Sequence, residues 1–171
     1  MNLYPFHLRP VHELDAAALL ALWQDLEKES PYVMISPGER HRSIREEQGD
    51  LRHLLAQPNQ MMWVVEDRDQ LIAWLGAWGE PYLRLRHSVI LGLGVRQAYR
   101  RQGLATGLFA ALHAWAPPQA IRRLELTVAV ENHPAILLYQ QQGFQIEGTK
   151  RQSYRIGDRL VDEYLMGKLL P

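Results

Sequence analysis

The chain has 171 residues, and its 19 lysines and arginines balance its 19 aspartates and glutamates, so its formal net charge at pH 7 is zero. A hydrophobic fraction of 47% is typical of a soluble globular protein, and the length suits one full core, so we expect a single domain over residues 1–171. The balanced charge gives no electrostatic reason to expect nucleic acid or a membrane as a partner. The absence of cysteine excludes disulfides, thiolate metal sites and a cysteine nucleophile.

The N-terminus lacks the basic and apolar regions of a signal peptide, and no apolar run approaches the roughly 20 residues that span a bilayer. With the lack of cysteine, this favours a cytoplasmic protein. The histidines show no metal-ligand spacing, so no metal site is predicted.

Hydrophobic periodicity predicts the first half of the chain as two helices and three strands. A Ser43-x-x-Glu46 pattern forms a capping box at the start of the second helix. In chain order we expect strand 3–9 ended by Pro10, helix 12–28, loop 30–42, a helix from Ser43 to about Ala56, and strands 61–66 and 71–78.

The second half continues with four strands and two helices. Asn132 is a suitable N-cap for the last helix, and Gly143 is placed to end it. In chain order we expect strand 84–95, helix 104–115 closed by two prolines, strand 124–128, the helix that begins after Asn132, and strands 144–148 and 160–169.

The stretch from Val95 to Thr106 predicts an anion site. It passes from a strand through a tight turn into a helix N-terminus, which carries unpaired N–H groups and the positive end of the helix dipole. Gly103 lets the backbone approach a ligand closely, and Arg96, Arg100 and Arg101 add positive charge. The expected guest is a pyrophosphate, although an arginine pair at a surface is more often simply solvated.

Two better-known phosphate loops fit this stretch worse, because it has neither a Gly-Lys-Ser/Thr ending nor three glycines that open a βαβ unit. What remains, Arg100-x-x-Gly103-x-Ala105, resembles the coenzyme A motif Q/R-x-x-G-x-G/A of the Gcn5-related N-acetyltransferase (GNAT) family.

A second segment resembles the same family. Asn132, Ala135, Tyr139 and Gly143-Phe144 match its pattern N-x-x-A-x-x-x-Y-x-x-x-G-F. The family's bacterial small-molecule branch is also resembled at segments 32–34, 37–40, 147–151 and 162–166, so the resemblance covers nearly the whole chain.

The resemblance implies a mixed, mostly antiparallel α/β sheet of about seven strands with about four helices. The fourth and fifth strands splay apart to admit acetyl-CoA, and Gly92 and Gly94 fit a fourth strand that bulges. Leu93 and Val95 would bond the pantetheine arm through main-chain groups. The implied cofactor-binding residues are Leu93, Gly94, Val95, Arg100, Arg101, Gln102, Gly103, Leu104, Ala105, Thr106, Asn132, Ala135 and Tyr139.

The implied reaction is acetyl transfer from acetyl-CoA to an amine. At pH 7 only about one alkyl amine in 10³ is neutral, so a base must remove a proton. Many family members use a glutamate on the fourth strand, but Ile90 stands there in this chain. The base is therefore Glu80, Glu39 or a water held by backbone carbonyls.

Tyr139 matches the family's general acid, which protonates the departing thiolate. Helical spacing alone makes it a buried aromatic residue. The acceptor is a small amine, a peptide N-terminus or a protein lysine, and its surroundings are expected among Tyr32, Met34, Trp78, Glu80, Arg84 and Arg86.

Two further hypotheses stay open. The missing strand-four glutamate is consistent with a non-catalytic module that binds or senses acyl-CoA, and a structural or interaction protein would bind no coenzyme at all. Family members commonly form dimers, so the resemblance also implies a homodimer.

Overall fold

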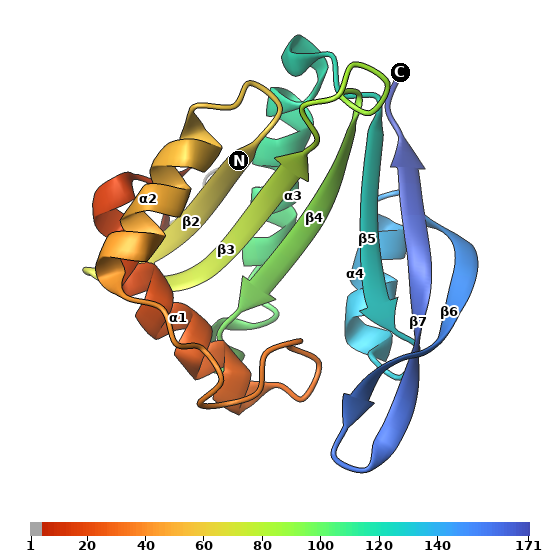
Figure 1. Cartoon of the computed structure of the whole chain (residues 1–171), viewed down its shortest axis with the longest axis horizontal. Coiled ribbons are helices and arrows are strands. Elements are labelled where there is room, and N and C mark those ends of the chain that lie inside the picture. The colour runs from red at the N-terminus through yellow and green to blue at the C-terminus, as the bar shows by residue number, and fades with distance from the viewer. Residues whose placement is uncertain (1–4) are drawn as a thin grey trace.

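A computed structural model describes residues 5–171 (Figure 1). Seven strands form one sheet in the order β1-β2-β3-β4-β5-β7-β6, in which only β4 and β5 are parallel neighbours. The strands are β1 (His7–Pro10), β2 (Met61–Asp67), β3 (Gln70–Gly79), β4 (Ser88–Val95), β5 (Arg123–Ala129), β6 (Gln145–Ile156) and β7 (Arg159–Leu169).

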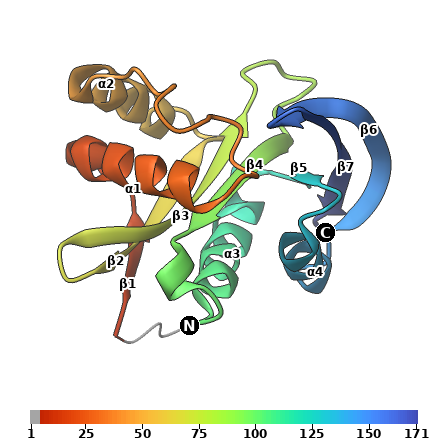
Figure 2. The same ribbon diagram turned by 90° about the horizontal axis from the view of Figure 1, so that it is seen from below.

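Helices cover both faces of this sheet, as Figure 2 shows. The α helices in the described residues are α1 (Ala16–Glu29), α2 (Ile44–Leu55), α3 (Leu104–Trp115) and α4 (His133–Gln141). Helices α1 and α2 pack on one face around Leu19, Leu22 and Leu51, whereas α3 and α4 pack on the other around Phe109 and Phe144. The predicted mixed sheet and helix number are confirmed.

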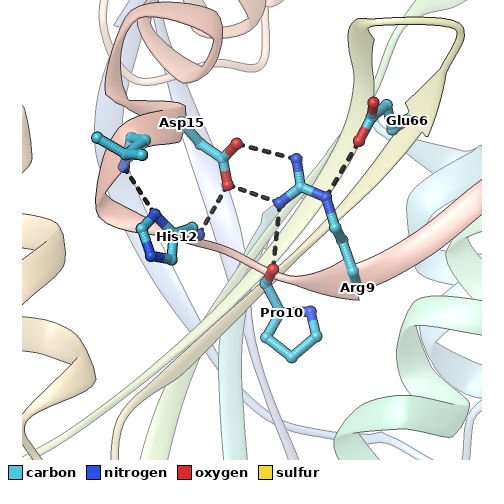
Figure 3. A network of polar contacts seen from close by, with 6 residues as sticks. Arg9, Pro10, His12, Asp15 and Glu66 are labelled. Carbon is cyan, nitrogen blue, oxygen red and sulfur yellow. Dashed lines mark hydrogen bonds and ion pairs between the residues drawn. The ribbon is translucent and has the colours of Figure 1, made fainter.

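The first helix begins later than predicted. A 3-10 turn, η1 (Glu13–Asp15), precedes α1, and His12 caps it: its Nδ1 accepts the Leu14 N–H and its own N–H donates to Asp15 Oδ2 over 2.7 Å. The Arg9 guanidinium holds Asp15 at 2.7 Å and Glu66 at 3.0 Å (Figure 3). This network ties the start of the helical layer to strands β1 and β2.

The capping residues predicted for α2 and α4 are confirmed. The Ser43 side chain accepts the Glu46 N–H, and Glu46 bonds back to the Ser43 N–H at 2.8 Å. Asn132 caps α4, and Gly143 follows that helix with a φ of +88°.

Three predicted strands differ from the observed ones by more than one residue. Strand β4 starts at Ser88 rather than 84, because Tyr82 O accepts the N–H groups of Leu85 and Arg86 and folds that segment into turns. Strand β6 runs on to Ile156 because it pairs with β7 along most of its length. The first strand runs from His7 to Pro10, which pairs with Trp63, so the predicted strand residues 5 and 6 are not part of it. Its predicted residues 3 and 4 lie outside the described residues.

The sheet divides in its middle. Strands β4 and β5 pair only from Ser88–Ile90 to Arg123–Glu125, and then diverge as a V that opens toward the carboxyl ends of both strands (Figure 1). The splayed pair implied by the resemblance is therefore confirmed.

The predicted bulge in β4 is wrong. Strand β4 pairs with β3 without a register shift from Val89 to Val95. Its glycines make room for tryptophans instead, because a Cβ on Gly92 would lie 2.9 Å from the Trp74 ring and one on Gly94 would lie 2.6 Å from Trp74 Nε1.

Helices long and apolar enough to cross a membrane are absent from the described residues. The same residues contain no group of three or more histidine, aspartate or glutamate side chains that could hold a metal ion.

Candidate active site

The free edge of β4 forms one wall of the V. The Arg96 N–H donates to Ile72 O on β3 at 2.9 Å. Because N–H directions alternate along a strand, the N–H groups of Leu93 and Val95 point the other way, toward β5. Strand β5 has already diverged at this height. These main-chain groups therefore face the V, in the position that a ligand running along β4 would need.

A second set of free donors lies where β4 leads into α3. The N–H groups of residues 103–106 donate no hydrogen bond to another residue in the range 5–171, and the first bond of the helix runs from Gly107 N to Gly103 O. Gly103 has a φ of +81°, and nothing lies within 4 Å of where its Cβ would stand. The turn is thus an open cradle of backbone donors at a helix N-terminus, which suits a phosphate group.

The arginines at this turn have different surroundings. Arg100 and Arg101 are exposed, and Arg100 Nε donates to Val95 O over 3.2 Å. Arg96 is not free for an anion, contrary to the expectation from sequence, because it forms ion pairs with Asp25 at 3.1 Å and Glu29 at 3.5 Å on α1.

The remaining residues of the turn offer a ligand mainly their main-chain groups. Gln102 is exposed, and its side chain donates to Ala98 O at 3.2 Å. Leu104 is 1% exposed and belongs to the core, so only its N–H can meet a ligand. Ala105 is half-buried and Thr106 is exposed.

The contacts that anchor the turn between β4 and α3 were not predicted from the sequence. The Tyr99 hydroxyl donates to Asp67 Oδ2 at 3.0 Å, at the end of β2, and its ring packs edge-on against Phe6. The hydrogen bond to Asp67 raises the pKa of Tyr99. A carboxylate of α1 also takes part, since Glu29 Oε2 accepts the Gln97 N–H at 2.6 Å.

Across the V, the start of α4 is held by its cap. Asn132 Oδ1 accepts the Ala135 N–H at 3.4 Å, and the Asn132 carbonyl accepts the N–H groups of Ala135 and Ile136. Both Asn132 and Ala135 are half-buried, so their side chains remain partly open to solvent.

Tyr139 lies between α3 and α4. It is 9% exposed and packs edge-on against Phe109 of α3, with Phe144 at 6.0 Å between ring centroids. The hydroxyl makes no hydrogen bond to another residue in the range 5–171. Burial raises the pKa of Tyr139 to about 12, so the phenol keeps its proton at neutral pH and can donate it.

The two carboxylates proposed as the base lie on surface loops. Glu39 Oε2 accepts the Ser36 N–H at 2.9 Å within its own turn. Glu80 follows β3 and is exposed, and its carbonyl accepts a hydrogen bond from Asn59. Neither carboxylate is brought onto the strands that border the V.

The other residues expected near the acceptor are scattered. The Tyr32 hydroxyl reaches over to Glu131 O at 3.4 Å, whereas Met34, Arg84 and Arg86 are exposed on loops. Trp78 borders a cleft of about 320 Å³ under α2, whose lining includes Trp23, Arg40, Arg42, Glu47, Gln60 and Met62.

The model of the acetyltransferase (GNAT) family matches residues 19–144, about three quarters of the chain. This chain belongs to the GNAT family. A GNAT acetyltransferase from Streptococcus pneumoniae superposes on it with a TM-score of 0.93 and 27% identity, covering 97% of this chain and 99% of that one.

Two curated bacterial relatives of this GNAT protein match over shorter stretches. The uncharacterized N-acetyltransferase YycN of Bacillus subtilis is 33% identical over 92 residues, and the L-amino acid N-acetyltransferase AaaT of Escherichia coli is 35% identical over 88. These matches cover 53% and 50% of this chain. The chain spans 59% and 54% of the length of these relatives.

Proposed function

We propose that the protein transfers an acetyl group from acetyl-CoA directly to a primary amine of a small molecule or peptide. The observation that carries the proposal is the presence of two sets of free backbone N–H groups that border the V. The edge of β4 offers the N–H groups of Leu93 and Val95, and residues 103–106 offer theirs at the helix start. An extended arm ending in a pyrophosphate fits these two sets together.

Relatives support this proposal. The yncA protein of Salmonella typhimurium shares the fold with a TM-score of 0.84 at 16% identity, and its structure was solved with its cofactor acetyl-CoA. The name of AaaT specifies L-amino acids, and a Brucella melitensis neighbour with a TM-score of 0.83 is named a ribosomal-protein-alanine N-acetyltransferase. We therefore propose an acceptor nitrogen on an amino acid or a peptide.

Each part of the V has a chemical task in this proposal. A main-chain N–H of β4 polarises the thioester carbonyl, as an oxyanion hole does. Tyr139, whose phenol is protonated at neutral pH, gives its proton to the departing thiolate. Arg100, Arg101 and Gln102 surround the phosphates, and Asn132 and Ala135 border the arm.

The first test is a thermal-shift titration with acetyl-CoA. Binding to the native state raises its stability by about 2.7 kcal/mol at 100 times Kd. We expect this shift in the wild type and its loss in the Arg100→Ala/Gly103→Glu double variant. A wild type with no shift at saturating acetyl-CoA contradicts the proposal.

The second test separates an enzyme from a module that only binds acyl-CoA. Release of free thiol from acetyl-CoA is measured against a panel of the twenty amino acids, alanyl peptides and polyamines. Turnover with at least one amine is expected. Binding without turnover on any amine would favour the non-catalytic module.

A further inference from the structure

We propose that Glu125 on β5 is the group that binds the acceptor's ammonium and takes its proton. The proposal rests on the acetyltransferase function proposed above. Glu125 would act as the general base from β5, because Ile90 occupies the position on β4 where many family members have a glutamate.

Strand register places Glu125 at the point of the V. Ile90 pairs with Glu125, and this is the last pair before β4 and β5 part. Side chains of laterally paired residues project from the same face of a sheet. The alternate β5 residues Leu124 and Leu126 are buried in the core under α3, so Glu125 faces the opposite side, the side of α1 and α2.

That face is open at this point. Ile90 is 59% exposed, and the Glu125 side chain is 40% exposed. On the other side of Glu125, its partner on β7 is Gly167, and the Glu147 side chain of β6 lies over that glycine. An amine approaching from the α1–α2 side can therefore reach both the carboxylate and the gap between the strands.

Both hydrogen bonds that the Glu125 carboxylate accepts go to the same oxygen. Glu125 Oε1 accepts the Ser88 Oγ hydrogen bond at 2.8 Å and the Arg123 Nε–H at 2.6 Å. Oε2 makes no hydrogen bond with a residue in the range 5–171. A carboxylate fixed in this way keeps lone pairs for an ammonium group.

The local charge also favours a cation. The guanidinium of Arg123 is shared with Glu147 of β6, whose Oε1 lies 2.9 Å from it. The groups packed around Glu125 are thus Ser88 and Ile90 of β4, Arg123 of its own strand, Glu147 of β6 and Gly167 of β7. Two carboxylates and one guanidinium leave one excess negative charge. Such a site attracts an ammonium ion.

The proposed reaction is a direct transfer of the acetyl group from sulfur to nitrogen. The ammonium gives one proton to Glu125, and the nitrogen lone pair then forms a bond to the acetyl carbon. The carbon–sulfur bond breaks, and the thiolate takes the Tyr139 proton. The second nitrogen proton returns to Tyr139 through water, and Glu125 releases its proton to solvent. The products are the amide, free coenzyme A and one proton.

The test uses Glu125→Gln with the amine that the panel identifies. Glutamine keeps the acceptor oxygen for Ser88 but cannot take a proton. We expect unchanged affinity for acetyl-CoA by thermal shift and a fall in kcat of about 10²–10⁴-fold. The control is Glu13→Gln, because Glu13 is also paired with an arginine (Arg52, 2.8 Å) but lies in η1.

Several results would overturn the inference. Full kcat in Glu125→Gln refutes it, and so does a variant whose KM alone rises. A loss of kcat in Glu80→Gln or Glu39→Gln, with Glu125→Gln active, assigns the proton elsewhere. A wild type that binds acetyl-CoA but acetylates no amine refutes the proposed function itself and this inference with it.

Discussion

Replacing Gly103 with alanine tests the cofactor turn with the smallest possible change. Gly103 has a φ of +81°, in the left-handed region, and nothing lies within 4 Å of the added Cβ. The cost in the free protein is therefore conformational, about 1–2 kcal/mol for a left-handed L-residue. For a chain of this size that lowers Tm by about 2–8 °C.

The matched control is Gly38→Ala. Gly38 has a φ of +89°, and its Cβ position is equally open, but it lies in the loop between α1 and α2. Both variants should lose the same stability. Only Gly103→Ala places a methyl group against the proposed phosphate site. If it weakens binding about tenfold, the stabilisation by acetyl-CoA falls from about 2.7 to about 1.4 kcal/mol at the same ligand concentration.

Both quantities come from one experiment, thermal unfolding with and without acetyl-CoA. Equal ligand-induced shifts in the wild type, Gly38→Ala and Gly103→Ala would show that no ligand group approaches the Cα of residue 103. A Gly103→Ala variant as stable as the wild type would refute the assignment of strain to this turn.

Three further predictions concern packing, catalysis and pH. Gly94→Ala should lower the free energy of unfolding in urea by about 1–3 kcal/mol, because its Cβ would lie 2.6 Å from Trp74 Nε1. The control Gly148→Ala should leave the free energy of unfolding unchanged, because the nearest atom to its Cβ would be 3.8 Å away. Tyr139→Phe should keep stability and acetyl-CoA affinity but lower kcat; because burial raises the pKa of Tyr139 to about 12, its ionisation should not limit the wild-type rate below about pH 11. Burial raises the pKa of Glu47, so as the pH rises this carboxyl loses its proton at a lower pH in the unfolded chain than in the native state. At neutral pH, Glu47 therefore lowers the free energy of unfolding. Glu47→Gln should therefore be more stable than wild type at pH 7 by denaturant titration, and the difference should vanish below the ordinary carboxyl pKa.

The elements that sequence predicted well carry their signals locally. Ser43 and Glu46 cap a helix through their own backbone, and Asn132 does the same for α4. Gly103 and Gly143 stand where a positive φ is needed. Such signals need no knowledge of the rest of the chain.

The errors came from partners distant in sequence. Arg96 looked available for an anion, but it is paired with carboxylates on α1 about seventy residues earlier. The glycines Gly92 and Gly94 predict a bulge, yet their lack of side chains makes room for the indole of Trp74 on the neighbouring strand β3. Only the folded sheet brings these groups together.

The candidate base shows the same limit. Glu125 alternates with leucines in an ordinary half-buried strand, so its pattern predicts only a solvent-facing residue. Its place beside Ile90 follows from a parallel pairing across thirty-five positions, which no local pattern reveals. The comparison with the GNAT pattern does indicate that the usual glutamate of the fourth strand is replaced by Ile90.

The V also places an unpaired strand edge inside the molecule. From Leu91 to Val95, β4 is apolar, rich in glycine and without a charged side chain, a composition that would invite strand addition by another chain at the rim of a sheet. Here β5, α3 and α4 flank that edge (Figure 2). Charged side chains, which prevent the edge strands of other sheets from pairing with another chain, are therefore not needed on β4. A change that loosens the half of the sheet formed by β5, β6 and β7 should therefore promote self-association as well as unfolding.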